Sequence, residues 1–184
     1  PKLSEIRRTS KFAKDQVWER DTSYESWTWT YTVSEKGIER EELIPQEDWE
    51  PEQLEWYEAE VMRLHFGTWI MINGLPVYLN KYCYFFLQWF VLLGQPAPGQ
   101  TVSRPAFKDV CLEYFYFFEL CEGDRFCFGD IGIKGRRVGL SSMSASIKVL
   151  IGILESNTLS GIVSKTGTDA QEMYFMVKNG IENL

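Results

Sequence analysis

A basic, glycine-containing turn over residues 134–142 is the part of this sequence best suited to chemistry. It reads Lys-Gly-Arg-Arg-Val-Gly-Leu-Ser-Ser and follows an aromatic, strand-like run over residues 125–133. A helix pattern from Met143 to Leu154 comes directly after it. A strand that turns straight into a helix leaves unpaired backbone N–H groups at the helix start, where the helix dipole also favours an anion. The layout predicts a phosphate-binding loop.

The loop departs from the usual phosphate-binding pattern, G-x-x-x-x-G-K-[ST], in which the lysine reaches the β- and γ-phosphates. Lys134 stands at the first position, Gly139 at the sixth and Leu140 at the seventh, so the standard lysine is missing. Two interpretations stay open: a cation reaches the phosphates from the opposite side, or the segment is only a tight turn. The candidate phosphate-binding residues are Lys134, Gly135, Arg136, Arg137, Val138, Gly139, Leu140, Ser141 and Ser142.

In the nucleotide-binding interpretation, each residue type has its own task. The glycines let the backbone approach the phosphates, and the amides of residues 138–142 surround them. Ser141 stands at the eighth position and is favoured over Ser142 as the ligand of Mg²⁺. Lys134 or Arg137 would reach the γ-phosphate in place of the missing lysine. The predicted cofactors are ATP and Mg²⁺.

Three features of the loop resemble the deviant Walker A motif of phage terminase large subunits, the ATP-driven motors that package viral DNA. They are a basic residue at the start, an Arg-x-Gly step and a hydroxyl residue after the second glycine. The matching positions here are Lys134, Arg137, Gly139 and Ser141. Three flanking segments also look like terminase sequence, so that the resemblance runs from residue 60 to residue 184: Ile72–Asn80, Arg104–Asp109 and Ser160–Met173.

The resemblance implies further residues and partners. The nucleotide base is expected to stack on residues upstream of the loop, with Arg104 and Phe107 as candidates, although Phe107 also suits a core position. Lys165 and Thr166 close the second predicted strand, at the sheet end where ligands of α/β folds gather. In the full protein the implied partners are viral DNA, a terminase small subunit, a portal protein and further copies of the chain. The implied location is the host cytoplasm.

Hydrolysis requires groups that these residues do not supply. An acidic residue must hold the metal and a carboxylate must orient the water. No apolar strand ending in Asp-Glu follows the loop, and Glu113, Glu119 and Glu122 fall on a predicted helix that precedes it. The catalytic residues therefore stay unknown. We expect the N-terminal portion of a motor, without its nuclease domain, that binds ATP weakly and turns it over negligibly.

Two other functions fit the same residues. One is a different P-loop ATPase, such as a helicase-like protein, with an atypical loop. The other is a non-enzymatic α/β interaction module whose basic turn binds an anion or a partner.

The elements around the loop predict an α/β fold with an incomplete parallel βαβ core of the P-loop NTPase type. Its strands would cover residues 125–133 and 160–165, with helices over 143–154 and 169–182. A capping box of Thr168 and Gln171 is expected to open the last helix.

An α+β region with β-hairpins and aromatic helices is predicted to precede this core. Residues 1–50 form an N-terminal extension with a small hairpin, residues 51–124 a helical and hairpin region, and residues 125–184 the first part of the ATPase core. Within residues 51–124, the pattern predicts a helix over 52–66 that ends at Gly67, followed by a hairpin with its turn at Asn73-Gly74. It also predicts a helix over 81–93 that Asn80 caps, and a helix over 106–121 that is buried on several sides.

Composition limits the function classes. Hydrophobic residues make up 45% of the 184 residues, which argues against disorder. The net charge of −7 opposes binding to DNA, whose phosphates are also negative, but the excess of acidic residues is concentrated in one segment. From Glu35 to Glu60 there are eleven acids against Lys36 and Arg40, which gives 2 − 11 = −9. This segment is either a solvated face or a docking surface for a basic partner.

The remaining polar and sulfur residues predict no second site. Four cysteines lie in apolar runs without metal-site spacing and are expected to be buried thiols. His65, the single histidine, is expected near a helix end. The apolar run from Tyr82 to Leu93 is shorter than the roughly 20 residues of a membrane span and contains Gln88, so a core helix is predicted.

Overall fold

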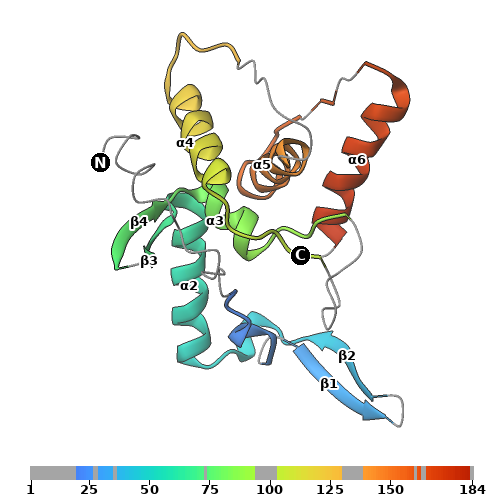
Figure 1. Ribbon diagram of the computed structural model, residues 1–184. Coiled ribbons are helices and arrows are strands. Elements are labelled where there is room, and N and C mark those ends of the chain that lie inside the picture. Colours follow the sequence, from blue (N-terminus) through green and yellow to red (C-terminus); the bar gives the residue numbers. More distant parts are fainter. Residues whose placement is uncertain are drawn as a thin grey trace.

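A computed structural model describes residues 20–26, 29–34, 37–72, 74–93, 103–129, 139–159, 161–162 and 165–182. In these segments the protein is mixed α/β and mostly helical (Figure 1). The strands are β1 (Trp29–Ser34), β2 (Gly37–Leu43), β3 (Thr68–Ile72) and β4 (Leu75–Leu79). The α-helices are α2 (Pro51–Phe66), α3 (Lys81–Gln88), α4 (Asp109–Gly123), α5 (Leu140–Leu154) and α6 (Gly167–Glu182), with short 3₁₀ turns η1 (Ser23–Ser26) and η2 (Gln46–Asp48).

Both described sheets are two-stranded and antiparallel, and both were predicted as hairpins. β3 pairs with β4 from Thr68 opposite Leu79 to Ile72 opposite Leu75. Gly74 has φ 74°, the left-handed conformation that this tight turn requires. β1 pairs with β2 with an irregularity between Trp29 and Tyr31. The first strand is shorter than predicted, because residues 23–26 form the turn η1 instead.

Helix α2 begins and ends at residues that the sequence indicates. Pro51 occupies its first turn, where a missing N–H costs nothing, and Glu50 and Gln53 form a reciprocal capping box. The helix ends at Gly67, which has φ 74°. A Cβ at this position would lie 2.1 Å from the carbonyl oxygen of Leu79, so glycine is required both by the backbone angle and by the close approach of β4.

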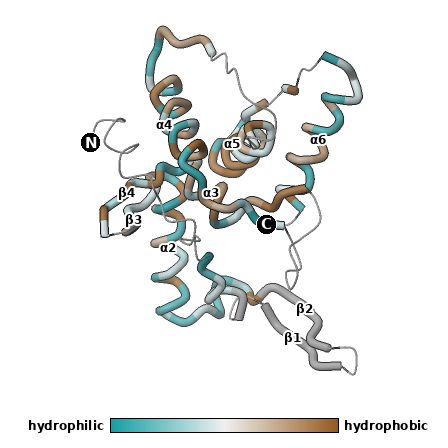
Figure 2. Tube along the Cα trace, viewed as in Figure 1, coloured by the Kyte–Doolittle hydropathy of each residue, from teal (hydrophilic) through white to brown (hydrophobic). Residues whose placement is uncertain are grey.

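Helix α3 lies at the centre of the core, and its colours in Figure 2 are mixed because Lys81 and Gln88 at its two ends are hydrophilic. Seven of its eight residues are buried. Asn80 caps it as predicted: its Oδ1 accepts a hydrogen bond from the amide of Cys83 at 3.0 Å, and its Nδ2 donates to the carbonyl of Phe115 on α4 at 2.8 Å. The helix ends at Gln88 rather than at residue 93. The core around it consists mainly of Leu79, Tyr82, Phe85, Phe90, Leu112, Phe115, Met143, Val149 and Leu150.

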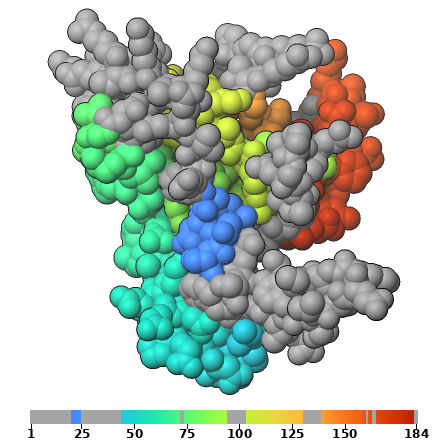
Figure 3. Space-filling model, turned by 60° about the horizontal axis from the view of Figure 1, so that its bottom comes forward, coloured from blue at the N-terminus to red at the C-terminus, as the bar shows by residue number. Residues whose placement is uncertain are grey.

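Residues 20–24 contact both α2 and α3 and so connect the two helices. In Figure 3 these residues are blue and lie beside α2, which is cyan. The buried amide of Gln88 donates to the carbonyl of Asp21 at 2.7 Å and accepts from its N–H at 3.1 Å. The Asp21 carboxylate accepts from the indole N–H of Trp56 at 3.0 Å. The Tyr24 ring lies against the rings of Trp56 and Trp89, at centroid distances of 5.2 and 4.9 Å.

Helix α4 differs from its prediction. It begins at Asp109 rather than Ala106, and although Tyr114, Tyr116 and Phe118 pack against the core, Phe117 and Leu120 are 53% and 72% exposed, so one side of the helix is not covered. Its buried residues are Cys111, Leu112 and Phe115, which face α3. α5 packs between α3 and α6 (Figure 1).

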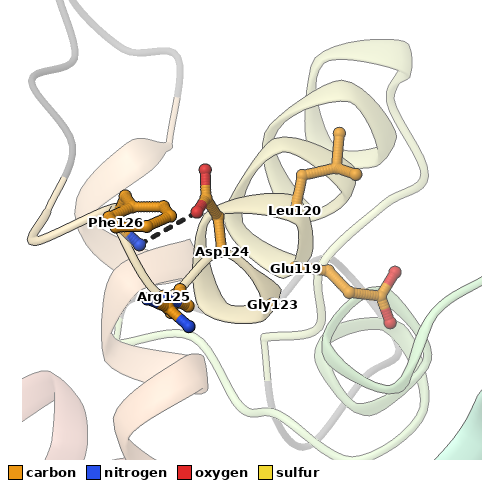
Figure 4. A pocket seen from close by; sticks show the side chains of 6 residues that line it. All are labelled: Glu119, Leu120, Gly123, Asp124, Arg125 and Phe126. Carbon is orange, nitrogen blue, oxygen red and sulfur yellow. Dashed lines mark hydrogen bonds between the residues drawn. The ribbon is translucent and has the colours of Figure 1, made fainter.

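The predicted parallel βαβ unit is not formed by the described residues. Arg125 and Phe126 lie in a turn, and residues 127–129 are irregular, so the first strand is absent from its described part; residues 130–133 lie outside the described segments. The Asp124 carboxylate accepts a hydrogen bond from the amide of Phe126 at 2.9 Å (Figure 4). Such a side-chain bond favours a turn over an extended strand.

The second predicted strand shows the same difference. Residues 161–162 are irregular and Lys165 lies in a bend, while residues 160, 163 and 164 lie outside the described segments. The prediction that Thr168 caps the last helix is wrong. Thr166 caps it instead, and its hydroxyl accepts a hydrogen bond from the amide of Asp169 at 3.1 Å. The N-terminal turn of α6 is therefore fixed by the hydroxyl two residues earlier in the sequence.

No helix in the described part of the chain is long and apolar enough to cross a membrane.

Candidate functional site

The start of α5 is the described part of the predicted phosphate loop. The helix begins at Leu140, three residues earlier than predicted, which places Ser141 and Ser142 in its first turn. Gly139 precedes it with φ 92° and ψ 8°, in the left-handed region. A Cβ at Gly139 would meet no atom within 4 Å, so the backbone angle rather than crowding calls for glycine there.

The first amides of α5 are not capped by a side chain among the described residues. The amide of Met143 closes the first helical turn on the carbonyl of Gly139 at 3.1 Å. No acidic side chain lies in the first turn. A left-handed residue followed by helical ones turns successive N–H groups toward one point, which is the backbone geometry of an anion-binding nest. The helix dipole adds to the attraction.

The structure brings together four of the nine predicted loop residues: Gly139, Leu140, Ser141 and Ser142. Lys134, Gly135, Arg136, Arg137 and Val138 lie outside the described residues. The cations of the loop therefore stay a prediction, whereas the backbone of residues 139–142 has a defined conformation.

The first turns of α5 are held by contacts that sequence patterns did not single out. The hydroxyls of Tyr114 on α4 and Ser144 lie 3.0 Å apart. Met143 and Ala145 are fully buried in the core, and the Oγ of Ser146 donates to the carbonyl of Met143 at 2.8 Å. These contacts connect the start of the helix to α4 and to the core. The sequence pattern placed Tyr114 on a predicted helix over 106–121, but nothing in the sequence indicated that its hydroxyl would contact Ser144.

The two candidate base-stacking residues serve the core in this structure. A guanidinium nitrogen of Arg104 donates to the carbonyl of Trp89 at 2.6 Å, just beyond the end of α3. Phe107 is partly buried and packs against the core cluster, which agrees with the core interpretation of this side chain. Lys165 and Thr166 lie at the start of α6, where Thr166 caps the helix rather than ending a strand.

A hollow of about 620 Å³ lies where the chain leaves α4 toward the loop (Figure 4). Its lining includes the ring of Phe126, which is 71% exposed, and the guanidinium of Arg125 lies 4.6 Å from the centroid of that ring. The residues that line the hollow include two carboxylates, those of Glu119 and Asp124, and one cation, that of Arg125. The charge of the hollow is therefore unsuited to phosphate.

One carboxylate of the acidic segment is not on a solvated face. Glu60 is only 4% exposed, and it accepts hydrogen bonds from the hydroxyl of Tyr84 at 2.7 Å and the indole of Trp89 at 2.6 Å. Arg63 pairs with the same carboxylate at 3.0 Å. Burial, together with this neighbouring carboxylate, raises the pKa of Tyr84. Glu60 is a satisfied structural charge that fastens α2 to α3, a role that its place in an acidic run concealed.

The cysteines are partly as predicted. All four are free thiols, Cys83 and Cys111 are buried, and Cys121 and Cys127 are half-buried. Burial raises the pKa of both buried thiols, that of Cys111 to about 11, so neither is activated as a nucleophile. His65 is exposed in the last turn of α2, as expected of a residue near a helix end. Within the described segments, no three His, Cys, Asp or Glu side chains converge as a metal site would require.

Comparisons with models of protein families, with curated proteins and with solved structures each found no match for this chain.

Proposed function

We propose that this chain is the N-terminal part of the ATPase domain of a phage terminase large subunit, and that residues 134–142 bind ATP with Mg²⁺. The observation that carries the proposal is the left-handed Gly139 directly before an α-helix whose first amides lack a side-chain cap. In this proposal, residues 139–142 are the part of the phosphate loop that lies within the described segments. The resemblance of the loop to the deviant Walker A motif of terminases supplies the choice of family.

In this proposal the described residues bind and orient the phosphates. The amides of Leu140, Ser141 and Ser142 donate to phosphate oxygens along the axis of α5. The hydroxyl of Ser141 takes the position of a metal ligand, and Mg²⁺ when bound would neutralise charge on the β- and γ-phosphates. Lys134 or Arg137 supplies the cation that position 140, a leucine, does not.

The proposal includes a fold and partners beyond those described. The proposal includes a parallel P-loop core, for which strands were predicted over residues 125–133 and 160–165; the described residues of these two ranges do not form strands. The partners proposed are viral DNA, a terminase small subunit, a portal protein and further copies of the chain, in the cytoplasm of the host. The acidic segment before α3 is unsuited to the DNA contact.

A second function is favoured by a different observation. The described sheets are antiparallel, and the chain turns at Asp124–Phe126 where a P-loop core would have its first strand. A non-enzymatic α/β interaction module with an anion-binding turn would need no parallel sheet. It would bind sulfate as well as ATP.

Thermal unfolding separates the two functions. A ligand present at a hundred times its Kd stabilises the native state by about 2.7 kcal/mol, so Mg-ATP should raise the melting temperature measurably. The terminase proposal expects a larger shift with Mg-ATP than with Mg-AMP or sulfate, and loss of that difference in Arg137→Ala. Arg125→Ala, which removes a cation outside the loop, is the matched control. Equal shifts with sulfate and Mg-ATP would instead support the anion-binding module.

A further inference from the structure

The outward face of the β3–β4 hairpin is as apolar as its inward face. Side chains alternate between the two faces of a strand. On the inward face, Ile70 and Val77 pack against the core. On the outward face, Trp69 and Met71 are 67% and 66% exposed, and Met71 lies opposite Pro76. A sheet with one solvated face usually carries polar residues on that face, so these large apolar side chains call for an explanation.

The exposed apolar surface continues onto the end of α2. Met62 and Phe66, one helical turn apart, are 57% and 64% exposed. Tyr78 joins the two elements, since its hydroxyl donates to the carbonyl of Phe66 at 2.5 Å and its ring lies 5.4 Å from that of Trp69. In Figure 3 the hairpin (green) adjoins α2 (cyan) on one side of the molecule. We call the residues Met62, Phe66, Trp69 and Met71 the apolar patch.

A row of carboxylates extends this surface along α2. Glu58 precedes Met62 by one turn, and Glu55 precedes Glu58 by three residues, so the three side chains share one helix face. Both glutamates are exposed. Between residues 41 and 80 the sequence has one Lys or Arg, Arg63, and it pairs with the buried Glu60. The side chains of α2 and of the hairpin therefore carry a net negative charge.

Charge decides between the occupants of such a surface. Nucleic acid and anionic membranes carry negative charge and would be repelled. A second copy meeting the patch about a two-fold axis would present the same patch and the same acidic row, so it would offer no cations to Glu55 and Glu58. A basic amphipathic helix satisfies both features: its apolar stripe covers Trp69 and Met62, while its cations face Glu55 and Glu58.

We propose that the apolar patch and the acidic row of α2 together dock a basic amphipathic helix of a partner protein. α2 has 16 residues, about 24 Å of helix, which suits a partner helix of similar length. Large, exposed Trp and Met side chains serve as anchors, and the carboxylates set the sign of the partner. The inference does not depend on nucleotide binding by the loop at the other end of the sequence.

The test uses the full chain and a defined probe, a fluorescein-labelled amphipathic helix of leucine and lysine, with a leucine–glutamate peptide of the same pattern as its control. Fluorescence anisotropy should show binding of the basic peptide that weakens with added salt. Trp69→Ser should weaken it by about tenfold or more, and so should the charge reversals Glu55→Lys and Glu58→Lys made together. Leu120→Ser, at an exposed apolar residue on α4, should leave the affinity unchanged.

Several outcomes would overturn the proposal. One is equal affinity for the acidic peptide, which would mean unspecific apolar binding. A second is an affinity for the basic peptide that neither Trp69→Ser nor the charge reversal changes. A third is concentration-dependent dimerisation, seen by sedimentation and abolished by Trp69→Ser, which would assign the patch to a second copy. Preferential binding to anionic vesicles would assign it to a membrane. Because Trp69 and both glutamates are exposed, circular dichroism should show all variants folded.

Discussion

Replacing Gly139 with alanine tests the conformation on which nucleotide binding is proposed. Gly139 has φ 92°, and an alanine held in the left-handed region costs about 1–2 kcal/mol. No atom lies within 4 Å of the added Cβ, so the cost comes from the backbone alone. If the free loop relaxes and must return to this conformation to bind, the same energy appears as a loss of affinity for Mg-ATP of about 5- to 30-fold.

Isothermal titration calorimetry with Mg-ATP measures the affinity, and two matched variants isolate the cause. Gly139→Asn should bind nearly as well as the natural chain, because asparagine visits the left-handed region readily. Gly74→Ala introduces the same kind of strain in the β3–β4 turn, at φ 74° with no atom within 4 Å, and should lower stability without lowering affinity.

Equal Mg-ATP affinities for the natural chain, Gly139→Ala and Gly139→Asn would refute the reasoning. The left-handed residue at the start of α5 would then have no part in binding phosphate.

Two further predictions concern stability. Gly67→Ala should lower the free energy of unfolding in urea by about 3 kcal/mol or more, since it combines a positive φ with a Cβ placed 2.1 Å from the carbonyl oxygen of Leu79. Gly74→Ala, also at a positive φ but with no atom within 4 Å of the added Cβ, is the control without a clash, and equal losses for the two variants would argue against the clash. Burial raises the pKa of Asp21, but hydrogen bonds from Ser23 and Trp56 and the charge of Arg63 lower it by more. The net result is a pKa below the ordinary value of 3.8. A carboxylate with a lowered pKa contributes stability above about pH 3.8 and loses it as pH falls through the folded value, so the stability difference between the natural chain and Asp21→Asn should shrink below pH 4. A difference that stays constant between pH 6 and pH 3 would count against this assignment.

Elements with local causes were predicted well. The Asn73-Gly74 hairpin, the Pro51 start of α2 and the Asn80 cap of α3 are each present. Each depends on residues within a few positions of one another, through a turn conformation or a cap bond. The helix over residues 140–154 is also present, and it starts three residues earlier than its apolar stripe indicated, because Gly139 rather than an apolar residue marks its beginning.

Features that depend on distant residues were not predicted. The acidic run gave no sign that Glu60 is buried, because its partners Tyr84 and Trp89 lie 24 and 29 residues away. The apolar residues of α4 predicted burial on several sides, yet the structure packs this helix against α3, α5 and β4 and leaves Phe117 and Leu120 exposed. Within the predicted strand 125–133, the described residues form a turn at 125–126, which the Asp124 side chain stabilises, and an irregular segment at 127–129.

By itself the sequence determined where helices and hairpins form and which segment has the composition of a phosphate loop, since caps, turns and periodicity act over a few residues. Only the tertiary structure decided which side chains those elements bury. Burial depends on which faces meet: Gly67 has to be a glycine because β4 approaches it, and Trp69 remains exposed because the core meets the other face of its strand.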